Sequence, residues 1–142
     1  MHLRENRLVT GFIDRARSLE ELERERWQAP PADATRLVAT VHALRSRPIG
    51  TLTVEDLRLL IGQDVGLLVL LPFAVEVLRD NPLAEGDMYE GDLLSAVLTR
   101  SPTVWGAHPE LANQLNVIVG GLTDLSPDLR SVVEEFAAVQ DS

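Results

Sequence analysis

The sequence predicts an all-α fold, a single compact domain of about seven or eight short helices, and three features of the 142-residue chain support this. Apolar residues recur at spacings of three and four through most segments, which is the period of a helix with one buried face. Ser, Thr or Asp precedes several of these segments and Pro begins others, as at helix starts. At this length about two thirds of the unfolded surface can be buried, so residues 1–142 suffice for one core.

Two helices are predicted at the N-terminal end of the chain. Apolar residues within 3–13 form one stripe of a first helix that reaches about Arg17. Ser18 and Glu21 have the spacing of a capping box, in which each side chain accepts a hydrogen bond from the backbone of the other residue. They predict a short second helix through about Glu25. We interpret the alternating Glu and Arg residues of that helix as a solvated face.

Two further helices are predicted before the middle of the chain. The first covers residues 34–45 and is closed by Pro48. Its buried face is predicted to hold Leu37, Val38, Val41 and Leu44. His42 lies at the flank of that face with no second His at ligand spacing, so we interpret it as a structural or surface residue. Thr53 begins the next helix as its cap, and Gly62 ends it.

The densest apolar run, residues 67–75, is predicted to form the centre of the core. A strand over residues 67–71 is the competing interpretation, because periodicity does not decide a short continuous apolar run. Helical spacing continues from Phe73 to Arg79, so we favour a helix that ends at Asn81-Pro82. The run is about half as long as the roughly twenty residues of a membrane span, which indicates a buried segment.

Four short helices are predicted in the C-terminal part of the chain. Asp92 can cap the first of them. The others begin near Pro102, Pro109 and Pro127, and Ser precedes two of these prolines. No repeat and no linker long enough to divide domains is visible between them.

The composition excludes several classes of protein. The formal net charge is −9, which repels a phosphate backbone and favours a basic partner, so we expect no direct contact with nucleic acid. There is no Cys, so disulfides and thiolate chemistry are impossible. All 13 basic residues are Arg, which excludes Schiff-base and P-loop chemistry because both need Lys. The N-terminus leads into no long apolar segment, so we expect a cytoplasmic protein without a membrane anchor.

No motif predicts catalysis or a cofactor. The nucleophile elbow, the dinucleotide-binding glycine motif and paired histidines at metal-binding spacing are all absent. Four carboxylates lie within residues 85–92, but their spacing is not that of a twelve-residue calcium loop. A glycosidase-like carboxylate pair would need aromatic residues to stack on sugar, and only Tyr89 is near. We therefore expect a protein that is not an enzyme and that binds neither a cofactor nor a metal.

Residues 85–92, which we call the acidic loop, are the candidate partner-binding site. Two glycines make this stretch poor at packing, and its carboxylates and its single Tyr suit an interface. The predicted contact residues are Glu85, Asp87, Tyr89, Glu90 and Asp92. The alternative is that the glycines and carboxylates only shape a turn between two helices and cap the second one.

Several motifs in order along residues 18–115 resemble the CdiI-type immunity proteins of bacterial contact-dependent growth inhibition systems. They are TVEDLR, IGQ, NPLAEGD and YEGDLL, followed by W-x-x-H-P-E-L at residues 105–111. Each motif is short, but the set in this order is specific. The acidic loop of the family often reads G-D-F-Y-P-G-D, whereas this chain has Met88 and Glu90 at the Phe and Pro positions.

The resemblance implies an immunity protein that is made beside its cognate toxin and neutralises the toxin domain by stoichiometric occlusion. Many such toxins are nucleases with basic active surfaces, which agrees with an acidic binder. From the residues alone, a helical adaptor or regulatory module with an endogenous bacterial partner remains the alternative. A hydrolase that uses the loop carboxylates is the weakest alternative.

Overall fold

The computed structural model describes residues 14–140, and within them the chain forms eight α-helices, one short 3₁₀ helix and no β-strand. The prediction of an all-α fold is confirmed. The elements are α2 (Leu19–Glu23), α3 (Arg36–Arg45), η1 (Ile49–Thr51), α4 (Val54–Gly62), α5 (Leu67–Asp80), α6 (Asp92–Leu98), α7 (Pro102–Ala107), α8 (Pro109–Gly120) and α9 (Pro127–Gln140).

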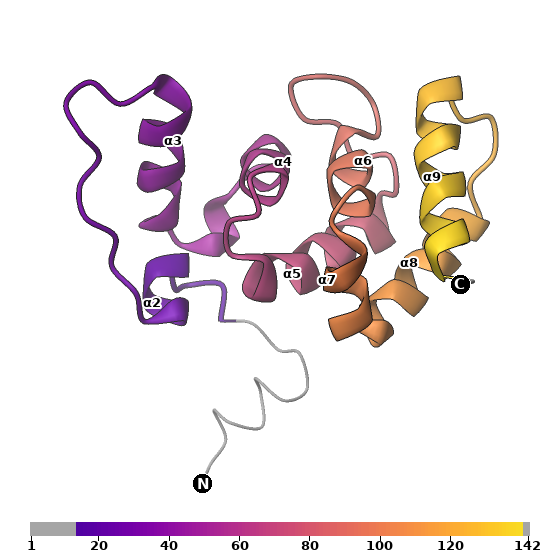
Figure 1. Ribbon diagram of the computed structural model, residues 1–142, viewed down its shortest axis with the longest axis horizontal. Helices are drawn as coiled ribbons and strands as arrows, with labels where there is room; N and C mark the ends of the chain where they lie inside the picture. The colour runs from indigo at the N-terminus through magenta and orange to yellow at the C-terminus, as the bar shows by residue number, and fades with distance from the viewer. Residues whose placement is uncertain (1–13, 141–142) are drawn as a thin grey trace, which may run out of the picture.

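Figure 1 shows α3, α4, α6 and α9 following one another along the long axis, with α5 running beneath α4 and α6. The first predicted helix lies mostly outside the described residues. Its last part, residues 14–17, forms a turn instead of a helix. The reason is local, because a carboxylate oxygen of Asp14 accepts a hydrogen bond from the amide of Ala16 at 3.0 Å and competes with helical bonding.

The predicted helix caps of α2 and α4 are confirmed. The Ser18 hydroxyl accepts from the Glu21 amide at 3.1 Å, and the Glu21 carboxylate accepts from the Ser18 amide at 3.0 Å. Thr53 and Asp56 make the same reciprocal pair at the start of α4. The helix α2 stops earlier than predicted because Arg24 adopts a left-handed conformation with φ of 56°.

The apolar run forms a helix, α5, and not a strand. The helix continues through Pro72, which removes one amide from the ladder of hydrogen bonds. It contacts α2, α4, α6 and α8, so it lies against four other helices. Its buried side chains are Leu70, Leu71, Phe73, Ala74, Val75 and Leu78. The predicted position of this segment at the centre of the core is confirmed.

The helix α3 departs from its predicted packing. Val41 and Leu44 are buried as expected, but Leu37 and Val38 are exposed. This helix lies at one end of the molecule, beside α4 (Figure 1). Because the N-terminal half of α3 extends past that neighbour, its apolar side chains meet less of the core than their spacing predicts.

The three helices predicted to begin at Pro are all present, as α7, α8 and α9. Ser101 and Ser126 accept hydrogen bonds from the amides of Thr103 and Leu129 at the starts of α7 and α9. The rings of Trp105 in α7 and Phe136 in α9 pack edge to face at 5.6 Å. Among residues 14–140, no helix has both the length and the apolar content needed to cross a membrane.

We expect Leu70→Ala and Leu78→Ala each to lower the free energy of unfolding by about 2–5 kcal/mol, because both side chains are fully buried in α5. Leu68→Ala is the matched control, since Leu68 lies in the same helix and is 73% exposed. It should change the free energy of unfolding by less than about 0.5 kcal/mol. Urea unfolding measures all three, and equal midpoints for the buried and exposed variants would contradict this assignment of the core.

Candidate functional site

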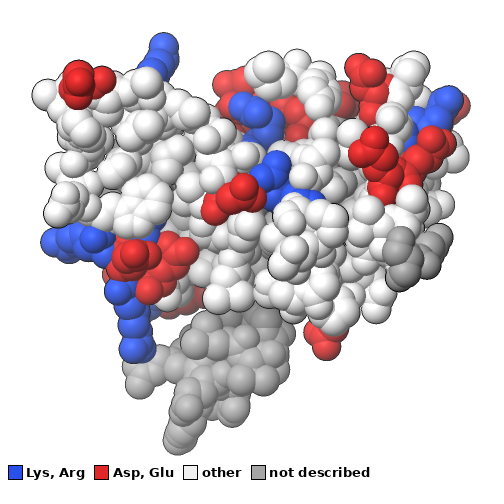
Figure 2. Space-filling view, in the orientation of Figure 1, with Lys and Arg blue, Asp and Glu red and all other residues white. Residues whose placement is uncertain are grey.

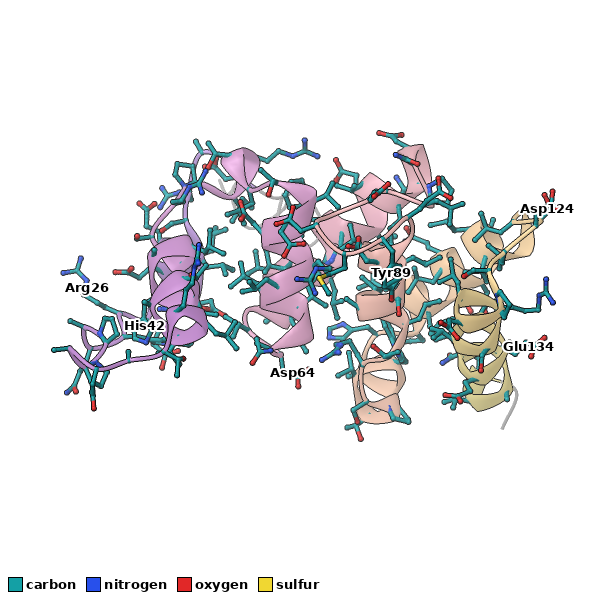
Figure 3. All side chains as sticks on the ribbon, turned by 90° about the horizontal axis from the view of Figure 1, so that it is seen from above. Arg26, His42, Asp64, Tyr89, Asp124 and Glu134 are labelled. Atoms are coloured by element: carbon teal, nitrogen blue, oxygen red, sulfur yellow. The ribbon has the colours of Figure 1, made fainter. Side chains whose placement is uncertain are left out.

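The acidic loop joins α5 to α6 and lies above these helices at the upper edge of Figure 1. Its side chains divide into an exposed set and a buried one. Met88 is 66% exposed and Tyr89 is 49% exposed. Glu85, Asp87 and Glu90 are also exposed. Seen from above, Tyr89 lies between α4 and α9 on this face (Figure 3).

The charge of the exposed loop carboxylates is the second feature of this surface. Within residues 14–140, no salt bridge involves Glu85, Asp87 or Glu90. The electrostatic potential of an exposed carboxylate is not cancelled when no cationic side chain pairs with it, so it attracts an approaching cation. The loop therefore presents an aromatic ring and a thioether together with exposed negative charge.

Asp92 does not belong to that exposed surface, although the sequence grouped it with the contact residues. Its side chain is 2% exposed and lies under the loop. One oxygen accepts from the amide of Gly86 at 2.7 Å, and the other accepts from the amides of Met88 at 3.0 Å and Tyr89 at 3.3 Å. Its predicted role as a helix cap is also corrected, because Gly91, with φ of 86°, is the cap of α6.

A second carboxylate reaches the loop from α4. The Oε1 atom of Glu55 accepts from the amide of Asp87 at 2.8 Å. The same carboxylate accepts two hydrogen bonds from the Arg58 guanidinium. Nε of Arg58 donates to Oε1 at 2.7 Å, and Nη2 donates to Oε2. Arg58 also lies 3.8 Å from an oxygen of Asp92. One arginine therefore lies within ion-pair distance of both carboxylates that bind the loop.

This arrangement shifts two pKa values. The hydrogen bonds from Arg58 hold the pKa of Glu55 below its ordinary value of 4.5. Burial opposes this by raising the pKa, and the hydrogen bond from the amide of Asp87 lowers it further by a smaller amount. The hydrogen bond to Glu55 raises the pKa of Arg58 in turn. Both groups are therefore charged at neutral pH, and the ion pair between them is present.

The sequence did not indicate Glu55 or Arg58 as part of the site. Their spacing of three residues predicts an ion pair within one helix, and this pair is present. No local pattern shows that the pair also reaches a loop about thirty residues further along the chain. The contact depends on how α4 packs against α6.

The carboxylates of α2 are used within the protein. Glu20 pairs with Arg26, and Glu23 pairs with Arg45, whose side chain is buried. Figure 2 shows acidic and basic atoms intermixed at this end of the molecule. Carboxylates of α2 are therefore in salt bridges within the protein, whereas the exposed carboxylates of the acidic loop form none within residues 14–140.

Metal binding has no geometric basis in the part of the chain that the structure describes. No group of three or more His, Asp or Glu side chains is arranged there to hold an ion. At the acidic loop, the oxygens of Asp92 face backbone amides instead.

We expect Glu55→Gln to lower the free energy of unfolding at pH 7 by about 1–3 kcal/mol, because it removes the charge that Arg58 and the amide of Asp87 bind. Folding lowers the pKa of Glu55, so this stabilisation is fully present above pH 4.5. It is lost as the pH falls through the lower pKa that Glu55 has in the folded protein. The difference between wild type and variant should therefore shrink below about pH 4.5. Urea titrations at a series of pH values measure it.

The control for this experiment is Glu134→Gln. Glu134 is exposed on α9 and forms no salt bridge within residues 14–140. Its substitution should leave the unfolding curve within about 0.5 kcal/mol of wild type. A Glu55→Gln difference that stays constant from neutral to acid pH would show that the charge of Glu55 does not stabilise the fold.

Comparison with known protein families identifies the chain. A family model described as CDI immunity proteins (CdiI_3) matches residues 21–115, which include α3 to α7 and the whole acidic loop. A search of curated proteins finds no match. The family match covers more than half of the chain and agrees with the resemblance in the sequence motifs. The chain therefore belongs to the family of CDI immunity proteins.

Proposed function

We propose that this protein neutralises a cognate toxin domain of a bacterial contact-dependent growth inhibition system by binding it stoichiometrically in the cytoplasm. Membership of the CDI immunity family is the observation that carries this proposal. The protein would act by occlusion and not by catalysis, and it would need no cofactor. The toxin would be basic, because the immunity protein carries a net charge of −9.

The acidic loop is the proposed contact surface. Tyr89 combines a large rigid ring with a polar hydroxyl, which are the properties of residues that dominate the energy of many interfaces. The exposed carboxylates of Glu85, Asp87 and Glu90 form no salt bridge within residues 14–140, and they would steer a basic toxin toward the ring. Asp92 would act from beneath the loop, since its oxygens bind the loop backbone.

We expect protection to require one immunity molecule for each toxin molecule, because an occluding binder is not regenerated while its complex persists. The test combines this protein with its cognate toxin domain, which we expect to be the C-terminal domain of a large secreted protein encoded upstream of its gene. Titration calorimetry should show a one-to-one end point, and toxin activity should fall linearly to zero at that ratio.

Protection at a ratio well below one to one would contradict occlusion and indicate an enzyme that modifies the toxin or its product. If the toxin domain formed no complex with this protein and cells co-expressing both were not protected, the proposed function would be wrong. The adaptor alternative would then become the better hypothesis.

We expect the triple variant Asp87→Ala, Tyr89→Ala and Glu90→Ala to raise the dissociation constant by about 30-fold or more, since it removes an aromatic anchor and two carboxylates together. Association should become slower and less dependent on salt, and dissociation should become faster. Stopped-flow kinetics at several ionic strengths measure these changes. Circular dichroism should show that the variant is folded, because all three side chains are exposed.

The matched control replaces Glu25 and Asp33 by Ala. Both side chains are exposed in the segment between α2 and α3, and neither forms a salt bridge within residues 14–140. The control removes the same formal charge from the end of the molecule where α2 and α3 lie, away from the acidic loop (Figure 1). If the control weakened binding as much as the loop variant did, net charge alone would account for the effect and the loop would not be the contact.

A further inference from the structure

Four consecutive backbone amides of the acidic loop donate hydrogen bonds to side chains from two different helices. The amides of Gly86, Met88 and Tyr89 donate to Asp92 in α6, and the amide of Asp87 donates to Glu55 in α4. Charge-assisted bonds of this kind are stronger than those between neutral groups. The loop backbone is therefore held around two carboxylates that the protein itself supplies.

Arg58 allows these two carboxylates to lie close together. Its guanidinium donates two hydrogen bonds to Glu55, and its Nε lies 3.8 Å from Oδ2 of Asp92. The positive charge of Arg58 therefore offsets part of the repulsion between the two carboxylates. The side chains of Glu55 and Arg58 are 20% and 25% exposed, and that of Asp92 is 2% exposed. These three groups face the underside of the loop, whereas Met88 and Tyr89 face outward.

We propose that Glu55, Arg58 and Asp92 are positioning residues, which hold the acidic loop in its binding conformation before the toxin arrives. This inference rests on the proposed function, because it assumes that the outer side of the loop contacts the toxin. A loop that visits its binding conformation only part of the time binds more weakly in proportion to that fraction. The three residues raise affinity by keeping the fraction near one, without touching the partner.

Gly86 provides a way to disturb this arrangement without changing any charge. A Cβ atom added at this position would lie 2.6 Å from Oε1 of Glu55 and 3.1 Å and 3.2 Å from the oxygens of Asp92. Glu55 cannot move away freely, because Arg58 and the amide of Asp87 hold it. Gly86→Ala should therefore displace the loop from its carboxylates without changing the identity of any exposed contact residue.

Gly106→Ala is the matched control. Gly106 lies in α7, where an added Cβ meets no atom within 4 Å. The two variants are chemically the same change. They differ in whether the new methyl group reaches the carboxylates under the loop.

The experiment measures two quantities on the full-length protein. Amide hydrogen exchange of the free protein reports the order of residues 86–89, and stopped-flow kinetics with the upstream-encoded toxin domain report binding. For Gly86→Ala we expect exchange at these amides to accelerate about tenfold or more, and the association rate constant to fall about tenfold. The dissociation rate constant should stay within about threefold of wild type, because the contacts in the complex are retained.

This pattern separates positioning from direct contact, since the loss of a direct contact mainly accelerates dissociation. Gly106→Ala should match wild type in both measurements. The proposal is overturned if Gly86→Ala exchanges and associates like wild type, or if its loop amides exchange faster while association is unchanged.

Asp92→Asn is the second variant, and it tests the same proposal if the Gly86→Ala protein does not fold. It keeps the size of the side chain but replaces one acceptor oxygen by an amide that cannot accept from Met88 or Tyr89. We expect the same slow association and fast local exchange. If wild type itself forms no complex with the toxin domain, the proposed function and this inference both fail. If wild type binds and both variants associate normally, only the inference fails.

Discussion

The burial of α5 is the constraint on which the rest of the structure depends. This helix contacts α2, α4, α6 and α8, and six of its fourteen residues are buried. Because its apolar side chains face several directions, neighbouring helices must cover it on more than one side. That requirement brings α4 and α6 together above it, although the acidic loop separates α6 from α5 in the chain (Figure 1). The core thus determines where the loop begins and what lies below it.

The acidic loop is ordered by polar groups and not by apolar packing. Asp92 approaches it from α6 and Glu55 from α4, so the shape of the loop depends on the distance between these two helices. Buried carboxylates are costly unless they are paired and hydrogen-bonded, and here Arg58 and the loop amides meet both conditions. A strongly charged segment can therefore keep a defined conformation on the surface of a small helical protein.

Negative charge serves two different purposes in this protein. Carboxylates of α2 and α4 are largely used in helix caps and ion pairs within the protein, which are structural. Those on the outer side of the acidic loop form no salt bridge among residues 14–140, and they flank an exposed aromatic residue in the chain. This distinction is more informative than the net charge, because only unpaired and exposed carboxylates act on an approaching protein. It agrees with the role implied by membership of the CDI immunity family.

The sequence by itself determined the all-α class, the central position of residues 67–78, most helix starts and the family, because caps, proline starts and apolar spacing act between residues a few positions apart. It also located the acidic loop and the residues on its outer side. Only the tertiary structure decided that Asp92 lies beneath the loop, that Glu55 and Arg58 support it, and that half of α3 is exposed. Each of these facts depends on which helices pack together. That packing follows from burial of the whole core, which no short pattern in the chain encodes.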